Sequence, residues 1–260
     1  MALKQRLDLL LVERGLAVSR EKARGMIMAG EVFVDGQVVD KPGSPTQLTA
    51  KVTKKEKARF VSRGGEKLAG ALKVFDIDVT GRICADIGAS TGGFTDCLLQ
   101  NGAKRVYSLD VGYGQLDYSL RQDSRVVVME RTNARYVEKL DETVNLVTID
   151  ASFISLKLLL PVIKRWLQPQ ADIIPLIKPQ FEAGKHDVGK GGVVKNPDIH
   201  KRVLEQILTF AVVEGFLIKG IVLSPLKGPA GNIEFLAWLG WGDTQTSSPD
   251  LKSLIQTVMT

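Results

Sequence analysis

Apolar and polar residues follow helical and then strand spacing over the first forty residues. Residues 6–14 (RLDLLLVER) place leucines on one face, which predicts a short helix. Residues 19–29 predict a second helix that Ser19 caps. Residues 31–39 (EVFVDGQVV) predict two strands, because the dipeptide Asp35-Gly36 suits the positive backbone angles of a tight hairpin turn. The chain therefore begins with helix, helix and hairpin.

This pattern weakens over residues 41–57, where Pro, Gly, Ser, Thr and Lys dominate. Such a composition is typical of a linker, here with room for one edge strand. We therefore expect two domains. A small α+β domain with its linker occupies residues 1–59, and a larger domain occupies residues 60–260.

Apolar runs alternate with helical stretches along the rest of the chain. The runs, in order, are RICADIG, FTDCLLQNG, RVYSLDVG, VVVMERTN, NLVTIDASF, LLLPVIKRWL and ADIIPLIKP. This alternation predicts an α/β fold, in which helices cover both faces of a mostly parallel sheet. Residues 216–225 and 232–241 are two further apolar runs and predict a C-terminal antiparallel hairpin. A serine cap and a proline in the first turn predict a closing helix within residues 248–259.

Composition places the chain among ordinary globular proteins. It has 260 residues, of which 44% are hydrophobic and 25% are charged, enough for one large core and one small module. Its most apolar stretch, residues 153–167, is broken by lysines, an arginine and a proline, and the N-terminus lacks the pattern of an export signal. We therefore expect a cytoplasmic protein with no membrane partner. The oligomeric state stays open.

Positive charge is concentrated in the first quarter of the chain. Residues 1–67 contain 14 Lys and Arg against 8 Asp and Glu, whereas residues 68–260 contain 21 of each, so the net charge of +6 belongs to the first segment. A basic segment beside a neutral domain is typical of a polyanion-binding attachment. A solvated surface explains the charge equally well.

Metal binding is not expected from the cysteines and histidines. Cys84 and Cys97 are the only cysteines and lack the spacing of a zinc knuckle, so we interpret them as small buried residues. His186 and His200 lie in or beside residues 182–200, without cysteine partners. That segment is rich in Gly and Lys, which suits either a loop that closes over a nucleotide or a plain surface loop.

A glycine-rich turn is the clearest candidate for a cofactor site. Residues 84–96 (CADIGASTGGFTD) combine a strand that ends in an acid with a turn whose missing side chains let a ligand approach the backbone. Asp110 ends the next strand and can accept hydrogen bonds from both hydroxyls of a ribose. The residues expected to contact the cofactor are Asp86, Gly88, Ser90, Gly92, Gly93, Phe94 and Asp110.

Two cofactors suit a turn of this kind. A dinucleotide fingerprint requires glycine at positions 88, 90 and 93, whereas position 90 is serine here. S-adenosylmethionine has no pyrophosphate and needs no glycine in the middle of the turn, and an acid such as Asp86 suits its amino and sulfonium charges. The comparison favours S-adenosylmethionine, with a purely structural glycine turn as the alternative.

The first domain resembles the small RNA-binding module that is named after a small-subunit ribosomal protein, also called the alpha-L motif, over roughly residues 5–45. This resemblance implies binding to structured RNA, largely through its shape and phosphates. The residues expected to contact RNA are Arg6, Arg20, Lys22 and Arg24, on or near the two helices, and Arg63.

Six motifs resemble those of the TlyA family, in the same order. They are FVSRGGEKLAGAL, the glycine-rich turn, ERTNARY, TIDASFISL, LIKPQFEAGK and GPAGNIEFL. That family comprises bacterial 2'-O-methyltransferases of ribosomal RNA, historically labelled hemolysins, with a catalytic domain similar to the FtsJ-type methyltransferases. The resemblance implies a class I methyltransferase fold, S-adenosylmethionine as cofactor, and ribosomal RNA or ribosomal subunits as partners. It also implies methylation of cytidine ribose in the large subunit, with the small subunit as a second candidate.

The same resemblance implies a catalytic tetrad of Lys67, Asp150, Lys178 and Glu234, and it places Asn133 at the adenine edge of the cofactor. A ribose hydroxyl is a poor nucleophile until its proton leaves. An ordinary lysine, with a pKa of about 10.4, is a poor base near neutrality unless burial and a nearby cation lower that value. We therefore predict that Lys178 is the base, that Asp150 orients it, and that Lys67 supplies the cation. Lys67 and Glu234 are also expected to position the ribose.

Each of these residues also has an ordinary structural explanation. A lysine before a proline, as at Lys178, usually lies exposed at a strand end, and Asp150 can cap a helix that begins near Ser152. Asn133 suits a turn nearly as well. Two other functions compete: a noncatalytic RNA-binding or ribosome-assembly factor, and a membrane-lytic protein. The intact turn and tetrad argue against the first, and the lack of an amphipathic or spanning segment argues against the second.

Overall fold

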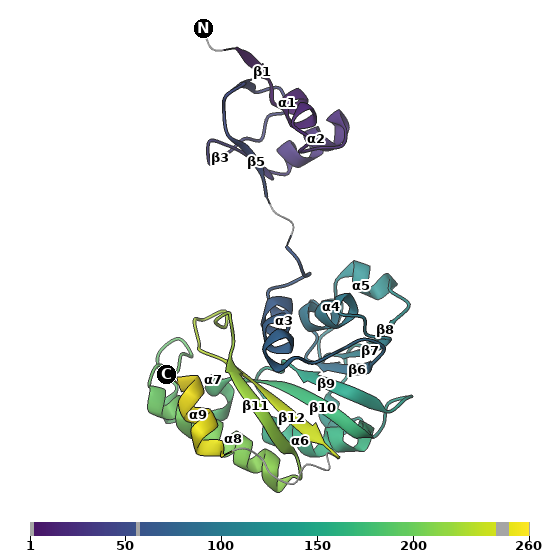
Figure 1. The fold of residues 1–260 in the computed structure, drawn as a ribbon, viewed down its shortest axis with the longest axis vertical. Coiled ribbons are helices and arrows are strands. Elements are labelled where there is room, and N and C mark those ends of the chain that lie inside the picture. Colours follow the sequence, from purple (N-terminus) through teal and green to yellow (C-terminus); the bar gives the residue numbers. More distant parts are fainter. Residues whose placement is uncertain (1–2, 56–57, 243–249, 260) are drawn as a thin grey trace. The chain divides into compact units, whose positions relative to one another are not determined.

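The computed structural model describes residues 3–55, 58–242 and 250–259. Contacts within the chain divide it into two units, residues 1–58 and residues 59–260 (Figure 1). The first unit contains two helices and five short strands, and the second contains the large sheet on which the candidate site is built.

The first unit begins with the two predicted helices and the predicted hairpin. Ser19 caps the second helix, since its hydroxyl accepts a hydrogen bond from the backbone N–H of Lys22 at 3.1 Å. Asp35 and Gly36 adopt positive φ angles of 50° and 82° in the hairpin turn. The elements are β1 (Lys4–Arg6), α1 (Leu7–Glu13), α2 (Arg20–Met28), β2 (Val32–Val34), β3 (Gln37–Val38), β4 (Pro45–Gln47) and β5 (Val52–Lys54).

The segment expected as a linker, residues 41–57, instead contributes two strands to the first unit. Strand β4 pairs antiparallel with β1, and β5 pairs antiparallel with β2. One side chain of each strand, Thr46 and Val52, is buried. The linker prediction is therefore wrong for most of this segment, because strands of three residues with a single buried position leave too weak a period to recognise.

A buried acid holds the first unit together beside its apolar core. The carboxylate of Asp8 is fully buried and accepts hydrogen bonds from Arg6 at 3.0 and 2.9 Å and from Arg20 at 3.0 Å. These arginines lower the pKa of Asp8 to about 2. The surrounding core consists of Leu7, Leu10, Leu11, Ala17, Ala23, Ile27, Val32 and Val52.

The second unit is a seven-stranded sheet in the order β11-β12-β10-β9-β6-β7-β8. Strands β8, β7, β6, β9 and β10 are parallel, whereas β12 is antiparallel to both β10 and β11. The prediction of an α/β fold with a mostly parallel sheet and a C-terminal antiparallel hairpin is thus confirmed. The strands are β6 (Ile83–Ile87), β7 (Arg105–Leu109), β8 (Val126–Met129), β9 (Val144–Ile149), β10 (Leu167–Ile177), β11 (Leu217–Leu223) and β12 (Phe235–Trp241).

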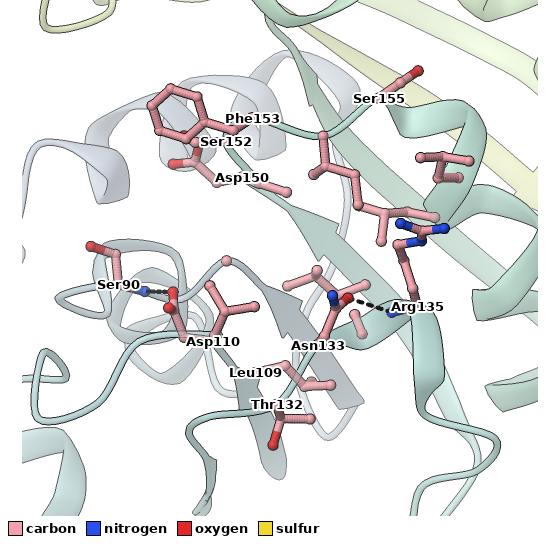
Figure 2. A pocket seen from close by; sticks show the side chains of 18 of the residues that line it. Ser90, Leu109, Asp110, Thr132, Asn133, Arg135, Asp150, Ser152, Phe153 and Ser155 are labelled. Carbon is pink, nitrogen blue, oxygen red and sulfur yellow. Dashed lines mark hydrogen bonds between the residues drawn. The ribbon is translucent and has the colours of Figure 1, made fainter.

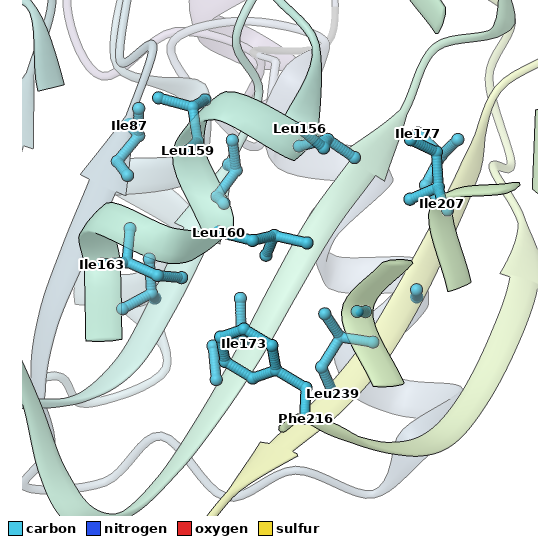
Figure 3. Packing of buried hydrophobic residues seen from close by; sticks show 14 of the residues in the cluster. Ile87, Leu156, Leu159, Leu160, Ile163, Ile173, Ile177, Ile207, Phe216 and Leu239 are labelled. Atoms are coloured by element: carbon cyan, nitrogen blue, oxygen red, sulfur yellow. The ribbon is translucent and has the colours of Figure 1, made fainter. Parts of the chain in front are cut away.

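Helices cover both faces of this sheet, and each face has its own core. On one face α6, α8 and α9 bury residues such as Leu160, Ile173 and Ile207 (Figure 3). On the other face α3 and α4 bury Leu68 and Leu98. The helices are α3 (Gly64–Phe75), α4 (Gly93–Gln100), α5 (Tyr118–Gln122), α6 (Leu156–Ile163), α7 (Pro179–Glu182), α8 (Pro197–Val213) and α9 (Leu251–Met259).

The closing helix α9 is present where the sequence predicts it. The Asp250 carboxylate accepts hydrogen bonds from the backbone N–H groups of Lys252 and Ser253, at 3.3 and 3.2 Å. The serine and proline expected to start this helix, Ser248 and Pro249, lie outside the described residues. Within the described ranges, no helix is both long and apolar enough to cross a bilayer.

A buried carboxylate joins three strands and a helix beneath the glycine-rich turn. Asp86 is the last residue but one of strand β6 and is fully buried. Its oxygens accept hydrogen bonds from Thr95 on α4 at 2.7 Å and from Thr148 on β9 at 3.0 Å, and Thr95 also bonds Ser108 on β7 at 2.8 Å. Burial raises the pKa of Asp86 to about 7, although both threonine hydroxyls oppose the shift.

This raised pKa predicts that the second unit loses stability as pH rises towards neutrality. An unfolded Asp loses its proton near pH 4, whereas folded Asp86 loses it at about 7. Between these values the folded state binds more protons, so the free energy of unfolding falls, by at most about 1.4 kcal/mol per pH unit. Asp86→Asn does not titrate, and its stability should therefore depend less on pH from about 5 to about 7.

Urea unfolding followed by tryptophan fluorescence measures this dependence, because Trp166, Trp238 and Trp241 all lie in the second unit. Asp78→Asn is the matched control, since the pKa of Asp78 is lowered and its carboxyl stays ionised over this range. Equal pH slopes for wild type and Asp86→Asn would contradict the prediction.

Candidate active site

One edge of the sheet gathers most of the polar residues that the sequence singles out. Asp110 and Asp150 directly follow the parallel strands β7 and β9, and Lys178 directly follows β10. Strand β12 runs the opposite way, so Glu234, which directly precedes it, reaches the same edge. Helix α3 adds Lys67 from its first turn. Ligands of open α/β sheets bind at this edge, outside the carboxyl ends of the parallel strands.

The four residues of the expected tetrad form two ion pairs in one cavity. Lys67 Nζ lies 2.5 Å from Glu234 Oε2, and Lys178 Nζ lies 2.7 Å from Asp150 Oδ1. Lys67 and Lys178 are only 7% and 8% exposed, and Glu234 is 1% exposed. All four line a cavity of about 290 Å³. Buried charges are costly unless they are paired, so each partner holds the other in place.

Lys178 is fixed by three contacts at the start of α7. Besides the Asp150 carboxylate, its ammonium donates to Ser152 Oγ at 2.9 Å and to the backbone carbonyl of Asp150 at 3.3 Å. The alternative of an exposed lysine at a strand end is therefore wrong. Proline at 179 forms the first turn of the short helix that follows.

Asp150 faces its lysine instead of capping a helix. Helix α6 begins at Leu156, and its N-cap is Ser155, whose hydroxyl accepts a hydrogen bond from the backbone N–H of Lys157. The capping explanation for Asp150 is therefore wrong. Burial raises the pKa of the Asp150 carboxyl above its ordinary value, while the Lys178 and Lys67 cations oppose this shift.

Lys67, which we expected to supply a cation beside Lys178, has an acidic partner of its own. Its ammonium forms an ion pair with Glu234. Glu234 is held from its other side by Gln180, whose Nε2 donates to Glu234 Oε1 at 3.2 Å. Lys67 is thus a paired cation whose charge still acts on the Asp150 carboxyl.

A larger cavity of about 620 Å³ adjoins the tetrad (Figure 2). Its volume suits a ligand of nucleoside size. Four residues, Gly88, Ser90, Asp150 and Ser152, line both cavities. A ligand in the larger cavity can therefore present one end to the tetrad.

The glycine-rich turn forms one wall of the larger cavity. Gly88 has a φ of 82°, and a Cβ atom on it would lie 2.8 Å from the backbone oxygen of Asp150, so only glycine fits where β6 approaches β9. Ser90 also has a positive φ, 50°, and its N–H donates to Asp110 Oδ2 at 2.8 Å.

Two further predicted cofactor residues, Asp110 and Asn133, also line the larger cavity. Asp110 Oδ1 accepts from the N–H of Gly112 at 2.7 Å, so both carboxylate oxygens are held in place. Asn133 Oδ1 accepts from the N–H of Arg135 at 3.1 Å (Figure 2). The amide nitrogen of Asn133 can thus donate to a ring nitrogen, and the Asp110 carboxylate can accept from hydroxyls. These groups fit a nucleoside.

The structure corrects two of the expected cofactor contacts. Asp86 lines neither cavity, because its carboxylate points into the sheet and is held by Thr95 and Thr148. Gly92 lines neither cavity either. It is needed for packing, because its φ is 96° and a Cβ atom would lie 2.2 Å from Leu120 Cδ1. Both residues support the turn and do not face the ligand.

Gly93 and Phe94 line the smaller cavity, on the tetrad side of the turn. A Cβ atom on Gly93 would lie 2.2 Å from Ser62 Oγ and 2.8 Å from the backbone nitrogen of Gly65. Glycine is therefore required where the start of α4 meets the start of α3. This close approach brings Lys67, on α3, to the end of the sheet.

Sequence reasoning missed several residues of the site. Ser152 holds Lys178, and Gln180 holds Glu234. Phe153 lines the larger cavity, is 90% exposed and has a positive φ of 61°. Its ring packs at a tilt against that of Phe181, with the centroids 4.8 Å apart. All four lie in the TIDASFISL and LIKPQFEAGK motifs, but only the fold shows which side chains face inward.

The Gly- and Lys-rich loop after α7 is tied to the segment that carries Glu234. Asn232 Oδ1 accepts from the N–H of Val194 at 2.9 Å, and Asn232 Nδ2 donates to the carbonyl of Gly192 at 2.9 Å. His200 is buried, and its Nε2 lies 3.0 Å from the carbonyl oxygen of Val194. The described residues include no group of three or more His, Cys, Asp or Glu that could hold a metal ion.

The residues expected to contact RNA fall into two groups. Arg6 and Arg20 are half-exposed but bound to the buried Asp8, so they already have structural roles. Lys22 and Arg24 are exposed on α2, and Arg63 is exposed beside α3, where it also lines the smaller cavity. The freely accessible cations of the first unit that we predicted are therefore Lys22 and Arg24.

Comparison with known proteins agrees with this geometry. A family model described as FtsJ-like methyltransferase matches residues 60–241, and an S4 domain model matches residues 5–48. The 16S/23S rRNA (cytidine-2'-O)-methyltransferase TlyA of Mycobacterium tuberculosis is 50% identical over 92% of this chain and 91% of its own length. Hemolysin A of Brachyspira hyodysenteriae is 43% identical over 89% of this chain and 98% of its own.

The solved structure of a provisionally named hemolysin from Streptococcus thermophilus is also similar. It has 46% sequence identity and a TM-score of 0.75, and the match covers 100% of this chain and 95% of that one. Identity at this level over almost the whole length of both chains establishes common family membership. The chain therefore belongs to the TlyA family of FtsJ-like methyltransferases, with an N-terminal S4 domain.

Proposed function

We propose that this protein transfers a methyl group from S-adenosylmethionine to the 2'-hydroxyl of a cytidine in ribosomal RNA. The observation that carries the proposal is the convergence of Lys67, Asp150, Lys178 and Glu234 in one cavity that adjoins a nucleoside-sized cavity. The relatives named as cytidine-2'-O-methyltransferases support the reaction and the substrate. A ribosomal substrate also implies action in the cytoplasm.

The larger cavity suits S-adenosylmethionine through the chemistry of its walls. Asp110 offers carboxylate oxygens to ribose hydroxyls, and Asn133 offers an amide to the adenine edge. Asp150 lies where the two cavities meet, so its carboxylate suits the positive charge of the methyl donor. When bound, the cofactor supplies the methyl group as a sulfonium.

Lys178 acts as the general base in this proposal. In its neutral form the amine would accept the proton of the 2'-hydroxyl while the oxygen bonds to the methyl carbon and the bond between that carbon and sulfur breaks. Asp150 orients the amine through the 2.7 Å contact, and Ser152 fixes it from a second direction. Because Asp150 lines both cavities, its carboxylate lies between Lys178 and the cation that the cofactor cavity would hold.

The second ion pair positions the acceptor nucleotide. Lys67 and Glu234 line the smaller cavity together with Asp150 and Lys178, and both are nearly inaccessible to solvent. Paired and buried groups keep one geometry, which is what an in-line transfer needs. We assign them to holding the ribose, and we assign Arg63, at the same cavity, to a phosphate of the RNA.

The experiment that tests this function uses ribosomal subunits from a strain that lacks the methylation. Purified protein and labelled S-adenosylmethionine are incubated with separated large subunits, small subunits and free ribosomal RNA, and the modified ribose is then mapped. We expect a 2'-O-methylcytidine in the large-subunit RNA, and the small-subunit arm decides whether the second target exists. Cofactor binding without transfer to any substrate would instead indicate a noncatalytic RNA-binding factor.

Removing the base should abolish chemistry and leave cofactor binding intact. Lys178→Ala is expected to lower kcat by about 10²–10⁴-fold, the usual contribution of a general base. Lys178→Arg is the matched control for charge, because it keeps the cation but does not release a proton near neutrality. We expect both variants to be slow and both to bind cofactor in calorimetry. Near-wild-type methylation by either would refute the assignment.

Exposed cations of the first unit should control RNA affinity. Lys22→Ala with Arg24→Ala is expected to weaken binding to ribosomal RNA and to lower the slope of log affinity against log salt by about one for each phosphate that the protein no longer neutralises. Filter binding at several salt concentrations measures this slope. Lys73→Ala, at an exposed position of α3 in the second unit, is the control. An unchanged slope in the double variant would exclude a role for these two cations in phosphate binding.

A further inference from the structure

Helix α7 connects the two ion pairs of the tetrad. Lys178, which precedes it, pairs with Asp150, and Gln180, its second residue, bonds Glu234. At its end, Glu182 accepts from Ser155 Oγ at 2.6 Å and from the N–H of Leu156 at 2.8 Å. A run of five residues therefore contacts the base, the second ion pair and the wall of the cofactor cavity.

Gln180 is the residue of this run whose side chain is only partly hydrogen-bonded. Its Nε2 donates to Glu234 Oε1 at 3.2 Å. Its carbonyl oxygen Oε1 is buried and has no hydrogen-bond partner, the only such side-chain atom among the described residues. A buried acceptor without a donor destabilises a folded protein. A residue kept at that cost beside the tetrad calls for a functional explanation.

The orientation of the amide follows from Glu234. Turning the amide over would place its oxygen against the carboxylate, and two acceptors repel each other. The bond to Glu234 therefore fixes the nitrogen inward and leaves the oxygen unpartnered. In this geometry Glu234 receives a hydrogen bond from a neutral donor, and the carbonyl oxygen of Gln180 goes without one.

Glu234 is held from two directions as a result. Lys67 occupies Oε2, Gln180 occupies Oε1, and Gly228 packs so closely that a Cβ atom on it would lie 2.5 Å from Oε1. Losing the Gln180 donor would leave one buried carboxylate oxygen unpaired. The carboxylate would then rotate, and Lys67 would move with it.

We infer that Gln180 is a positioning residue for the methyl transfer: it fixes Glu234, and through Glu234 the Lys67 ammonium, against the acceptor ribose. This inference rests on the proposed function. Lys178 and Gln180 are two residues apart at the start of α7. In this inference, α7 therefore positions both ion pairs at once. The same helix thus aligns the base and the acceptor.

Gln180→Met separates a positioning role from a structural one. Methionine matches the length of glutamine. It removes the unpartnered oxygen but also leaves Glu234 Oε1 without its donor, so the two effects oppose each other and thermal stability is expected to change little. The single-turnover rate at saturating RNA and cofactor should fall by about 10-fold to 100-fold, as expected for a misplaced reactant. Cofactor affinity in calorimetry should not change. Gln206→Met, on α8, is the matched control.

Gln180→Glu adds a second measurement, the pH dependence of the methylation rate, which a purely structural role would not change. At about pH 8 the new carboxylate repels Glu234, whereas at lower pH the pair holds a shared proton and the donor to Glu234 is restored. The rate of this variant relative to wild type, measured at each pH, is therefore expected to rise as pH falls from about 8 to about 6.

The outcomes are distinguishable. Wild-type rates for Gln180→Met, or a pH-independent ratio for Gln180→Glu, would overturn the inference while wild type remains active. A wild-type protein that transfers no methyl group to RNA would instead overturn the proposed function. If Gln180→Met unfolds, the ratio for Gln180→Glu decides alone.

Discussion

The ion pair between Asp150 and Lys178 is the interaction on which the site depends. It joins the ends of two neighbouring parallel strands, β9 and β10, at the edge where the two cavities meet. Gly88 makes this junction possible, because any side chain there would strike the backbone of Asp150. The glycine-rich turn therefore has two roles: it lines the larger cavity, and it leaves room for the backbone of Asp150. In the proposed function, this junction is where the methyl donor and the base meet the acceptor.

Burial gives this arrangement its rigidity. Lys67, Lys178 and Glu234 are each less than 10% exposed, and a buried charge without its partner is strongly destabilising. Each pair is also held by a neutral group, Ser152 for Lys178 and Gln180 for Glu234. The tetrad thus behaves as two restrained ion pairs. The neutral groups that hold them lie in the two motifs that also contain Asp150 and Lys178. Below it, Asp86 binds strands β6, β7 and β9 together through threonine and serine hydroxyls and keeps the turn in place.

Sequence reasoning reached the fold because the large sheet has long, regular apolar runs. It failed for residues 41–57, because β4 and β5 have three residues each and one buried position apiece. Family resemblance singled out the four residues that the smaller cavity gathers, whereas the glycine-rich turn indicated most of the cofactor cavity but misplaced Asp86 and Gly92. A strand-end acid can point into the sheet or out of it, and a glycine can serve a ligand or a neighbouring leucine. Gln180 and Phe153 gave no signal of their own, because their roles arise from residues more than fifty positions away or from an unusual backbone angle.

A double-mutant cycle on Asp150 and Lys178 tests the central claim most directly. Single-turnover methylation rates are measured for wild type, Asp150→Asn, Lys178→Met and the double variant, at saturating cofactor and RNA. If the pair acts as a unit, the double variant should be about as slow as the slower single variant, since the second substitution removes nothing further. Rate losses that multiply would show that the two residues act independently and would contradict this account.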